Sequence, residues 1–228
     1  MQSLKGSLFI VATPIGNLGD ITMRAVEVLR SVAIVACEDT RRSRVLFTHL
    51  GIASPRLVSC FEHNEQHRIP GILATLEEGK DAALITDAGT PNISDPGYRL
   101  VKACVDGGYR VIPVPGPCAA IAAISASGLP TDRFMYMGFP PVKKGRFEAF
   151  IDEALLPERT AVFYLPMRRV PATLELIAGK FPATRVVIAR ELTKLHEEFI
   201  RGTAGELLAA LPTLSTKGEC TFLCHRDE

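Results

Sequence analysis

The chain has 228 residues, of which 47% are hydrophobic and 22% charged, and this composition excludes a mostly disordered protein. Its length accommodates one large domain or two small ones. The formal net charge of +1 lacks the basic excess that is typical of nucleic-acid-binding proteins. No apolar stretch follows a basic start near the N-terminus, and the most apolar helical stretch, residues 117–129, is too short to span a bilayer. We therefore expect a cytoplasmic protein without a membrane-spanning segment.

Apolar runs of strand length alternate with helical patterns through the first half of the chain. The predicted strands are residues 8–12, 32–37, 57–60, 82–86 and 110–114. The predicted helices are one that starts after Thr22, a suitable N-cap, and those at residues 40–50, 65–76 and 98–105. Gly51 is expected to end the second helix, and Pro70 to interrupt the third. This alternation predicts a largely parallel sheet covered by helices.

Three prolines and a glycine within residues 113–117 form the strongest break in the sequence, because this composition favours neither a helix nor a strand. It predicts a boundary between two α/β domains, residues 1–115 and 116–228. Strands of the second domain are expected at residues 134–137, 160–164, 185–190, 197–201 and 219–224. Its helices are expected at residues 118–127, from residue 144, and at residues 170–179 and 204–211. Some neighbouring strands are expected to be antiparallel.

Six cysteines are scattered along the chain without a Cys-x-x-Cys pair, and most lie inside apolar runs. Cys220 and Cys224 are spaced as on one face of a strand. Reduced thiols in the core are favoured over a disulfide or a metal site, so no metal site is predicted.

Glycine- and proline-rich loops follow three predicted strands, at residues 13–20, 87–97 and 115–120. Ligands of open α/β sheets bind beyond the carboxyl ends of strands, where such loops lie. Each loop alone is typical of a tight turn, but together they predict one ligand pocket, because glycine lets a ligand approach the backbone. No Gly-x-Gly-x-x-Gly or Walker A motif is present, which argues against a dinucleotide site or nucleotide hydrolysis.

Several motifs occur in the order of a known family: TPIGNLGD at residues 13–20, EDTR at 38–41, HNE at 63–65, DAGTP at 87–91, PVPGP at 113–117 and ARELTK at 189–194. The chain resembles the ribosomal RNA small subunit methyltransferase I family, a branch of the tetrapyrrole methylases, from about residue 8 to residue 223. The resemblance implies two α/β domains with S-adenosylmethionine in the cleft between them, usually in a homodimer. It also implies methylation of a cytidine ribose 2′-hydroxyl in 16S ribosomal RNA.

The resemblance further implies a cofactor site on the three loops and on strand ends of the second domain. The expected cofactor contacts are Pro14, Asp87, Ala88, Gly89, Ile93, Ser94, Asp95, Cys118, Ala119, Leu165, Gly218, Glu219 and Cys220. Carbonyl dipoles and a nearby carboxylate suit a sulfonium cation, and this chemistry needs no metal.

Charged and polar motifs at predicted helix starts are candidates for contacts with ribosomal RNA. The expected substrate contacts are Glu38, Arg41, Arg42, Asn64, Glu65, Lys143, Lys144 and Arg146. In a plainer interpretation, Asp39 or Thr40 caps one helix, Asn64 caps the next, and the cations are solvated. Because a ribose hydroxyl is a poor nucleophile, a general base is expected, and the candidates are His63, Asp39 and Glu191.

The family usually has an ESPHR-like stretch after the strand that ends at Tyr164, whereas residues 165–169 here read LPMRR. One arginine of that pattern is therefore kept. Two other functions remain open from the sequence. The weak net charge favours a methylase of tetrapyrroles, and the altered stretch is the one feature in favour of a non-catalytic nucleotide-binding module.

Overall fold

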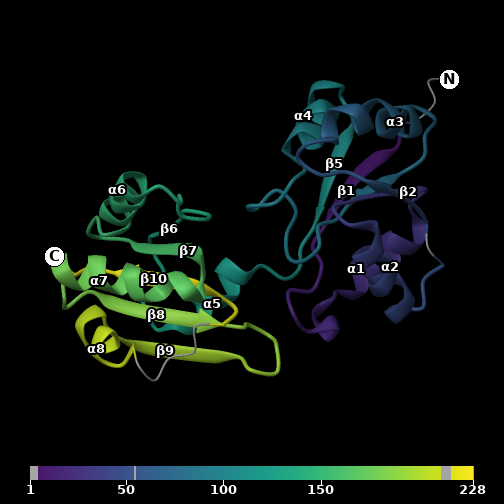
Figure 1. Ribbon diagram of the computed structural model, residues 1–228. Helices are drawn as coiled ribbons and strands as arrows, with labels where there is room; N and C mark the ends of the chain where they lie inside the picture. Colours follow the sequence, from purple (N-terminus) through teal and green to yellow (C-terminus); the bar gives the residue numbers. More distant parts are fainter. Residues whose placement is uncertain (1–4, 54, 212–216, 228) are drawn as a thin grey trace. The chain divides into compact units, whose positions relative to one another are not determined.

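The computed structural model describes residues 5–53, 55–211 and 217–227 (Figure 1). The chain divides into two compact units, Met1–Cys118 and Ala119–Glu228. Each unit contains its own five-stranded sheet with helices, which confirms the predicted α/β class. The division follows directly after the proline-rich segment at residues 113–117.

The sheet of the first unit is entirely parallel, as the sequence predicts, with the strand order β3-β2-β4-β1-β5. Its strands are β1 (Ser7–Val11), β2 (Ile34–Cys37), β3 (Arg56–Ser59), β4 (Ala82–Leu84) and β5 (Arg110–Val114). Its helices are α1 (Met23–Ser31), α2 (Thr40–His49), α3 (Glu65–Glu77) and α4 (Tyr98–Asp106), with the short 3₁₀ helix η1 (Leu18–Asp20) before α1.

Alternate residues of the first sheet face two separate cores, because successive side chains of a strand point to opposite faces. Val35 of β2 belongs to a cluster with Leu29 of α1 and Phe47 of α2. Its neighbour Ala36 belongs to a cluster with Ile72 of α3. Helices α1 and α2 thus cover one face, and α3 and α4 the other. The loops beyond the carboxyl ends of the strands are the part of such a sheet that is open to a ligand.

Helix ends in the first unit follow the signals in the sequence. The hydroxyl oxygen of Thr22 accepts a hydrogen bond from the N–H of Ala25 at 3.1 Å, which confirms the predicted N-cap of α1. Helix α2 ends at His49, and Gly51 follows with a φ of +59°. This left-handed conformation favours glycine after a helix.

Pro70 and Pro113 both lie inside regular elements of the first unit. The predicted interruption at Pro70 is wrong, because α3 continues through it. Pro70 is exposed, whereas Ile72 and Leu76 of the same helix are buried, so burial of that face outweighs the loss of one backbone hydrogen bond. Pro113 lies within β5, which is an edge strand among the described residues. A proline is tolerated there because an edge strand pairs on one side.

The sheet of the second unit has the order β6-β7-β10-β8-β9. Strands β6 and β7 are parallel, and the other neighbouring pairs are antiparallel, which confirms the predicted mixed character. The strands are β6 (Phe134–Tyr136), β7 (Thr160–Pro166), β8 (Arg185–Arg190), β9 (Glu198–Thr203) and β10 (Glu219–His225). The helices are α5 (Ala119–Ser127), α6 (Lys144–Ala154), α7 (Val170–Lys180) and α8 (Ala204–Ala209), with the 3₁₀ helix η2 (Met167–Arg169) before α7.

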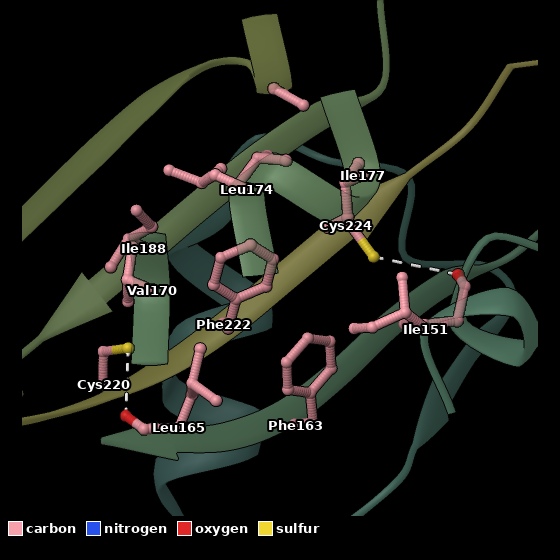
Figure 2. Packing of buried hydrophobic residues seen from close by; sticks show 14 of the residues in the cluster. Ile151, Phe163, Leu165, Val170, Leu174, Ile177, Ile188, Cys220, Phe222 and Cys224 are labelled. Atoms are coloured by element: carbon pink, nitrogen blue, oxygen red, sulfur yellow. Dashed lines mark hydrogen bonds between the residues drawn. The ribbon is translucent and has the colours of Figure 1, made fainter. Parts of the chain in front are cut away.

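The core of the second unit lies between this sheet and helices α6, α7 and α8 (Figure 2). At its centre, Phe163 of β7 stacks on Phe222 of β10 with ring centroids 5.0 Å apart. Cys220 and Cys224 face the same core, and their thiols donate to the carbonyls of Leu165 and Ala154.

All six cysteines are free thiols, and five of them are buried, while Cys118 is half-buried. The predicted core position is therefore confirmed for five. Burial raises the pKa of both Cys220 and Cys224 to about 12. Within the described residues, no three His, Cys, Asp or Glu side chains are grouped as metal ligands. Nor does any helix in this part of the chain have the length and apolar character needed to cross a membrane.

Candidate functional site

Three loops are joined at the carboxyl ends of the neighbouring strands β4, β1 and β5. Thr13, after β1, exchanges two backbone hydrogen bonds with Gly89, after β4, with N···O distances of 2.9 and 3.0 Å. The hydroxyl of Thr90 donates to the carbonyl of Pro117, after β5, at 3.0 Å. The structure thus brings together the three glycine- and proline-rich loops that the sequence singles out.

Gly89 lies where the three loops come together. Its φ of +86° is in the left-handed region that favours glycine. A Cβ atom at this position would lie 3.4 Å from Cγ2 of Ile15 and 4.0 Å from the carbonyl oxygen of Pro117. Asn92 and Ser94 of the same loop have positive φ values of 72° and 62°. Such angles cost non-glycine residues about 1–3 kcal/mol each and concentrate at ligand sites.

A group of carboxylates lies beside these loops. Asp87 accepts a hydrogen bond from the N–H of Asp39 at 3.1 Å and forms an ion pair with Arg42 at 3.1 Å. Burial, followed by the charge of Glu38, raises the pKa of Asp95 to about 6. Burial and the charge of Asp87 likewise raise the pKa of Glu38. Because Arg42 balances part of this negative charge, the remainder favours a cationic ligand.

An unused acceptor lies in the same loop. Oδ1 of Asn92 is buried and has no hydrogen-bond partner among the described residues. It faces Gly97, where a Cβ atom would collide with it. A buried acceptor without a donor costs about 1–3 kcal/mol.

The other expected cofactor residues of the first unit differ in exposure. Pro14 is buried after β1, whereas Ala88, Ile93 and Ser94 are exposed on the loop after β4. Cys118 is half-buried at the last position of the unit.

Asp39 caps α2, as one interpretation of the sequence predicts. Its carboxylate accepts the N–H of Arg41 at 2.8 Å and forms an ion pair with the Arg41 guanidinium at 2.7 Å. These hydrogen bonds with Arg41 lower the pKa of Asp39 to about 2. A carboxylate of such low pKa is a poor proton acceptor at neutral pH, so the geometry does not support Asp39 as the general base.

The three residues of the HNE motif, residues 63–65, lie in different surroundings. His63 is exposed, with its ring edge-on to Phe61 at a centroid distance of 6.3 Å. Asn64 precedes α3, but its side chain makes no cap hydrogen bond with that helix. Instead it accepts from the N–H of Phe61 at 2.8 Å and donates to the carbonyl of Ser59 at 3.1 Å. Its predicted capping role is therefore wrong, because the loop uses both ends of the amide.

Glu65 is buried, with 3% of its surface exposed, and its carboxylate accepts the N–H of Leu100 at 2.8 Å. Leu100 lies in the first turn of α4, whose N-cap residue, Gly97, has no side chain. Glu65 therefore takes the place of a capping side chain for another helix. This position is inconsistent with the expected contact between Glu65 and the substrate.

Glu191 holds a turn of the second unit. Its φ is +48°, its N–H donates to the carbonyl of Glu219, and its carboxylate accepts the N–H of Glu219, both at 3.2 Å. Lys194 forms an ion pair with it at 3.2 Å. Burial acts to raise the pKa of Glu191, but the Glu219 hydrogen bond and Lys194 lower it overall. The geometry supports a structural role for Glu191 and not the expected role as a base.

Among the remaining cofactor candidates of the second unit, Leu165, Gly218 and Cys220 lie at the start of β10. Leu165 and Cys220 are paired across β7 and β10, and both side chains are buried. At Gly218, with a φ of +91°, a Cβ atom would lie 2.6 Å from Oε1 of Glu191. Ala119 is the half-buried first residue of α5.

The cationic residues of the second unit that were expected to contact RNA lie exposed on its surface. Lys143, Lys144 and Arg146 are exposed at the start of α6, and none of them has an ion-pair partner among the described residues. The arginine kept in the LPMRR stretch, Arg169, donates to the carbonyls of Pro140 and Pro141 at 3.0 and 2.8 Å. It therefore holds the segment that leads into α6. No sequence signal indicated this contact.

The family model described as Tetrapyrrole (Corrin/Porphyrin) Methylases matches residues 7–208. Among solved structures, uroporphyrin-III-C-methyltransferase from Thermus thermophilus is 22% identical with a TM-score of 0.64, and covers 97% of this chain and 94% of that chain. The methyltransferase CobJ is 16% identical with a TM-score of 0.70 and the same two coverages. The fold and the matched residues define a methyltransferase of the tetrapyrrole methylase class.

Two curated relatives narrow this class. Ribosomal RNA small subunit methyltransferase I of Escherichia coli O157:H7 is 52% identical over 208 residues, which are 90% of this chain and 72% of the relative. The protein of the same name from Hydrogenobaculum sp. (strain Y04AAS1) is 43% identical over 222 residues, 96% of each chain. The chain belongs to the ribosomal RNA small subunit methyltransferase I family. These identities favour that branch over the enzymes that act on tetrapyrroles.

Proposed function

We propose that this chain transfers the methyl group of S-adenosylmethionine to the 2′-hydroxyl of a cytidine in 16S ribosomal RNA. The observation that carries the proposal is the group of loops joined at Gly89, beside the carboxylates Glu38, Asp87 and Asp95, in a chain of this family. The proposed substrate is the small-subunit RNA or an assembling small subunit, and the proposed setting is the cytoplasm, with the enzyme as a homodimer.

The first unit suits the methionine end of S-adenosylmethionine. This cofactor supplies an activated methyl group on a sulfonium cation and also carries an ammonium group. The carboxylates of Asp87 and Asp95 favour the positive charge of this ligand. The proposed contacts are Pro14, Asp87, Ala88, Gly89, Ile93, Ser94, Asp95, Cys118, Ala119, Gly218, Glu219, Cys220 and the backbone of Leu165.

Transfer to a ribose forms a bond between the 2′-oxygen and the methyl carbon, breaks the bond from that carbon to sulfur, and releases the hydroxyl proton. The expected bases Asp39 and Glu191 both have lowered pKa values. His63 is exposed and is the remaining candidate for a general base. We therefore propose His63 as the general base that accepts the proton of the ribose hydroxyl.

Exposed cations are proposed to hold the RNA backbone. Arg41 of the first unit, and Lys143, Lys144 and Arg146 of the second, are accessible to phosphates. Arg42 forms an ion pair with Asp87, so it contacts the proposed cofactor site and is also exposed to the RNA.

Methyl transfer from tritium-labelled S-adenosylmethionine to small ribosomal subunits that lack the modification tests the function. Nuclease digestion and mass spectrometry should find the label in 2′-O-methylcytidine, and Gly89→Val should abolish it. Labelling of an added tetrapyrrole, with none in ribosomal RNA, would overturn the proposal.

A further inference from the structure

Phe139 is an exposed aromatic residue in a segment that is otherwise firmly held. The segment follows β6, which ends at Tyr136, and turns at Gly138. Gly138 has a φ of +67°, and its carbonyl accepts the N–H of Tyr164 at 2.9 Å. Phe139 follows with 55% of its surface exposed. Its ring meets Tyr164 edge-on at a centroid distance of 5.4 Å, and Tyr164 also contacts Tyr136 at 5.2 Å. One side of the Phe139 ring is thus supported by protein while much of its surface faces solvent.

Arg169 fixes the next part of the segment. Its guanidinium donates to the carbonyls of Pro140 and Pro141 and lies 4.3 Å from the centre of the Phe147 ring. The two prolines restrict the backbone by themselves, because each ring fixes φ. The conformation around Phe139 is therefore set before any ligand binds, which lowers the entropy lost on binding.

Exposed cations follow this aromatic residue within a few positions of the sequence. Val142 is 91% exposed, and Lys143, Lys144 and Arg146 follow it without ion-pair partners among the described residues. We call Phe139, Val142, Lys143, Lys144 and Arg146 the basic–aromatic surface. Proteins bind single-stranded nucleic acid with a combination of exposed aromatic rings and cations, and this short segment carries both.

We propose that the basic–aromatic surface binds a single-stranded segment of the RNA substrate, with an unstacked base lying on Phe139 and the cations on adjacent phosphates. The inference rests on the proposed function, since it takes RNA as the substrate. Arg169 is a positioning residue, which holds the platform and does not touch the base. A second copy of the chain is a poorer occupant, because a two-fold contact centred on Phe139 would bring cations of both copies together.

The probe is a ten-nucleotide oligocytidylate, with binding measured by fluorescence anisotropy over a range of salt concentrations. Phe139→Leu should weaken binding about tenfold, since stacking of one base contributes a factor of roughly 5 to 150. The salt dependence should stay that of the wild type, because no charge is removed. Lys144→Ala should instead lower the log–log salt slope by about 0.7. Phe181→Leu is the matched control, since Phe181 is 40% exposed elsewhere on the same unit, and it should bind as the wild type does.

The outcomes separate this inference from the proposed function. If the wild type methylates ribosomal RNA and Phe139→Leu binds oligocytidylate equally well, the stacking platform is refuted while the function stands. If Phe139→Leu binds weakly but the wild type methylates no RNA, the surface stands and the function fails. A change from dimer to monomer in sedimentation, specific to Phe139→Leu, would show an interface between copies and overturn the inference.

Discussion

The carboxylate of Glu65 accepts the backbone N–H of Leu100, which lies 35 positions later in the sequence, at 2.8 Å. This hydrogen bond ties the start of α3 to the first turn of α4, on one face of the parallel sheet. It also ties the HNE motif to the end of the loop that carries Gly89 and Asp95. Glu65, which resembles a substrate contact in the sequence, thus supports the loop of the proposed cofactor site.

Glu65→Ala should destabilise the protein, because it leaves a buried N–H without a partner. The expected loss in the free energy of unfolding is about 2 kcal/mol. Glu65→Gln should lose less, since its amide oxygen can still accept. Urea denaturation measures both, with the exposed neighbour Glu62 as a control, where alanine should change little. Unchanged stability together with weaker RNA binding would restore Glu65 as a substrate contact.

Gly89→Val should remove cofactor binding and leave the protein folded. We expect the wild type to bind S-adenosylmethionine with micromolar affinity, about −8 kcal/mol, and the variant to bind at least about 100-fold more weakly. The cause is the φ of +86° and the closeness of Ile15 and Pro117. Calorimetry compares it with Gly71→Ala, an exposed helical glycine with nothing near its added Cβ. Normal binding by Gly89→Val would exclude this loop from the site.

Asp95→Asn should stabilise the protein at neutral pH and weaken the binding of S-adenosylmethionine. The pKa of Asp95 is raised from 3.8 to about 6 in the folded state. Folding therefore takes up a proton between these values, and stability falls as pH rises through this window, with the full penalty above about pH 6. The variant should gain about 1–2 kcal/mol at pH 7.5, allowing for solvent screening, and much less at pH 4. Thermal unfolding at the two pH values, with calorimetry of S-adenosylmethionine, checks both effects. Equal stability at pH 7.5 would show that burial costs this carboxylate nothing.

The double variant Arg41→Ala/Lys144→Ala should bind small-subunit RNA more weakly and with a flatter salt dependence. Two lost phosphate contacts should lower the log–log slope by roughly 1.4 for single strands. Cofactor affinity is the control, because neither side chain is among the proposed cofactor contacts. A slope and affinity equal to those of the wild type would mark both residues as solvated helix starts, with Arg41 satisfied by Asp39.

Local signals made most of the fold predictable. The N-caps Thr22 and Asp39 were readable because their partners lie two or three residues away. The error at Pro70 arose because the burial of Ile72 and Leu76, which sustains α3, depends on packing against distant elements. Strand periodicity sufficed to place Cys220 and Cys224 inside.

The site was less predictable, because its residues act across long sequence separations. The meeting of Thr13 with Gly89 follows from the topology of the sheet and not from either loop alone. Glu65 and Glu191 resemble functional acids in their motifs, yet both serve backbone N–H groups. The sequence around Arg169 does not indicate its carbonyl partners. The exposure of the Phe139 ring depends on the turn at Gly138, which the sequence alone does not predict.

The burial of five thiols gives the sixth a practical value. Cys118 is the half-buried cysteine at the last position before the second unit begins, whereas burial raises the pKa of the other five. A maleimide or spin label should therefore attach to Cys118 in the unaltered protein, because thiolates are the reactive form. Because Cys118 is also a proposed cofactor contact, bound S-adenosylmethionine should slow this labelling, and the effect can be measured without replacing any cysteine.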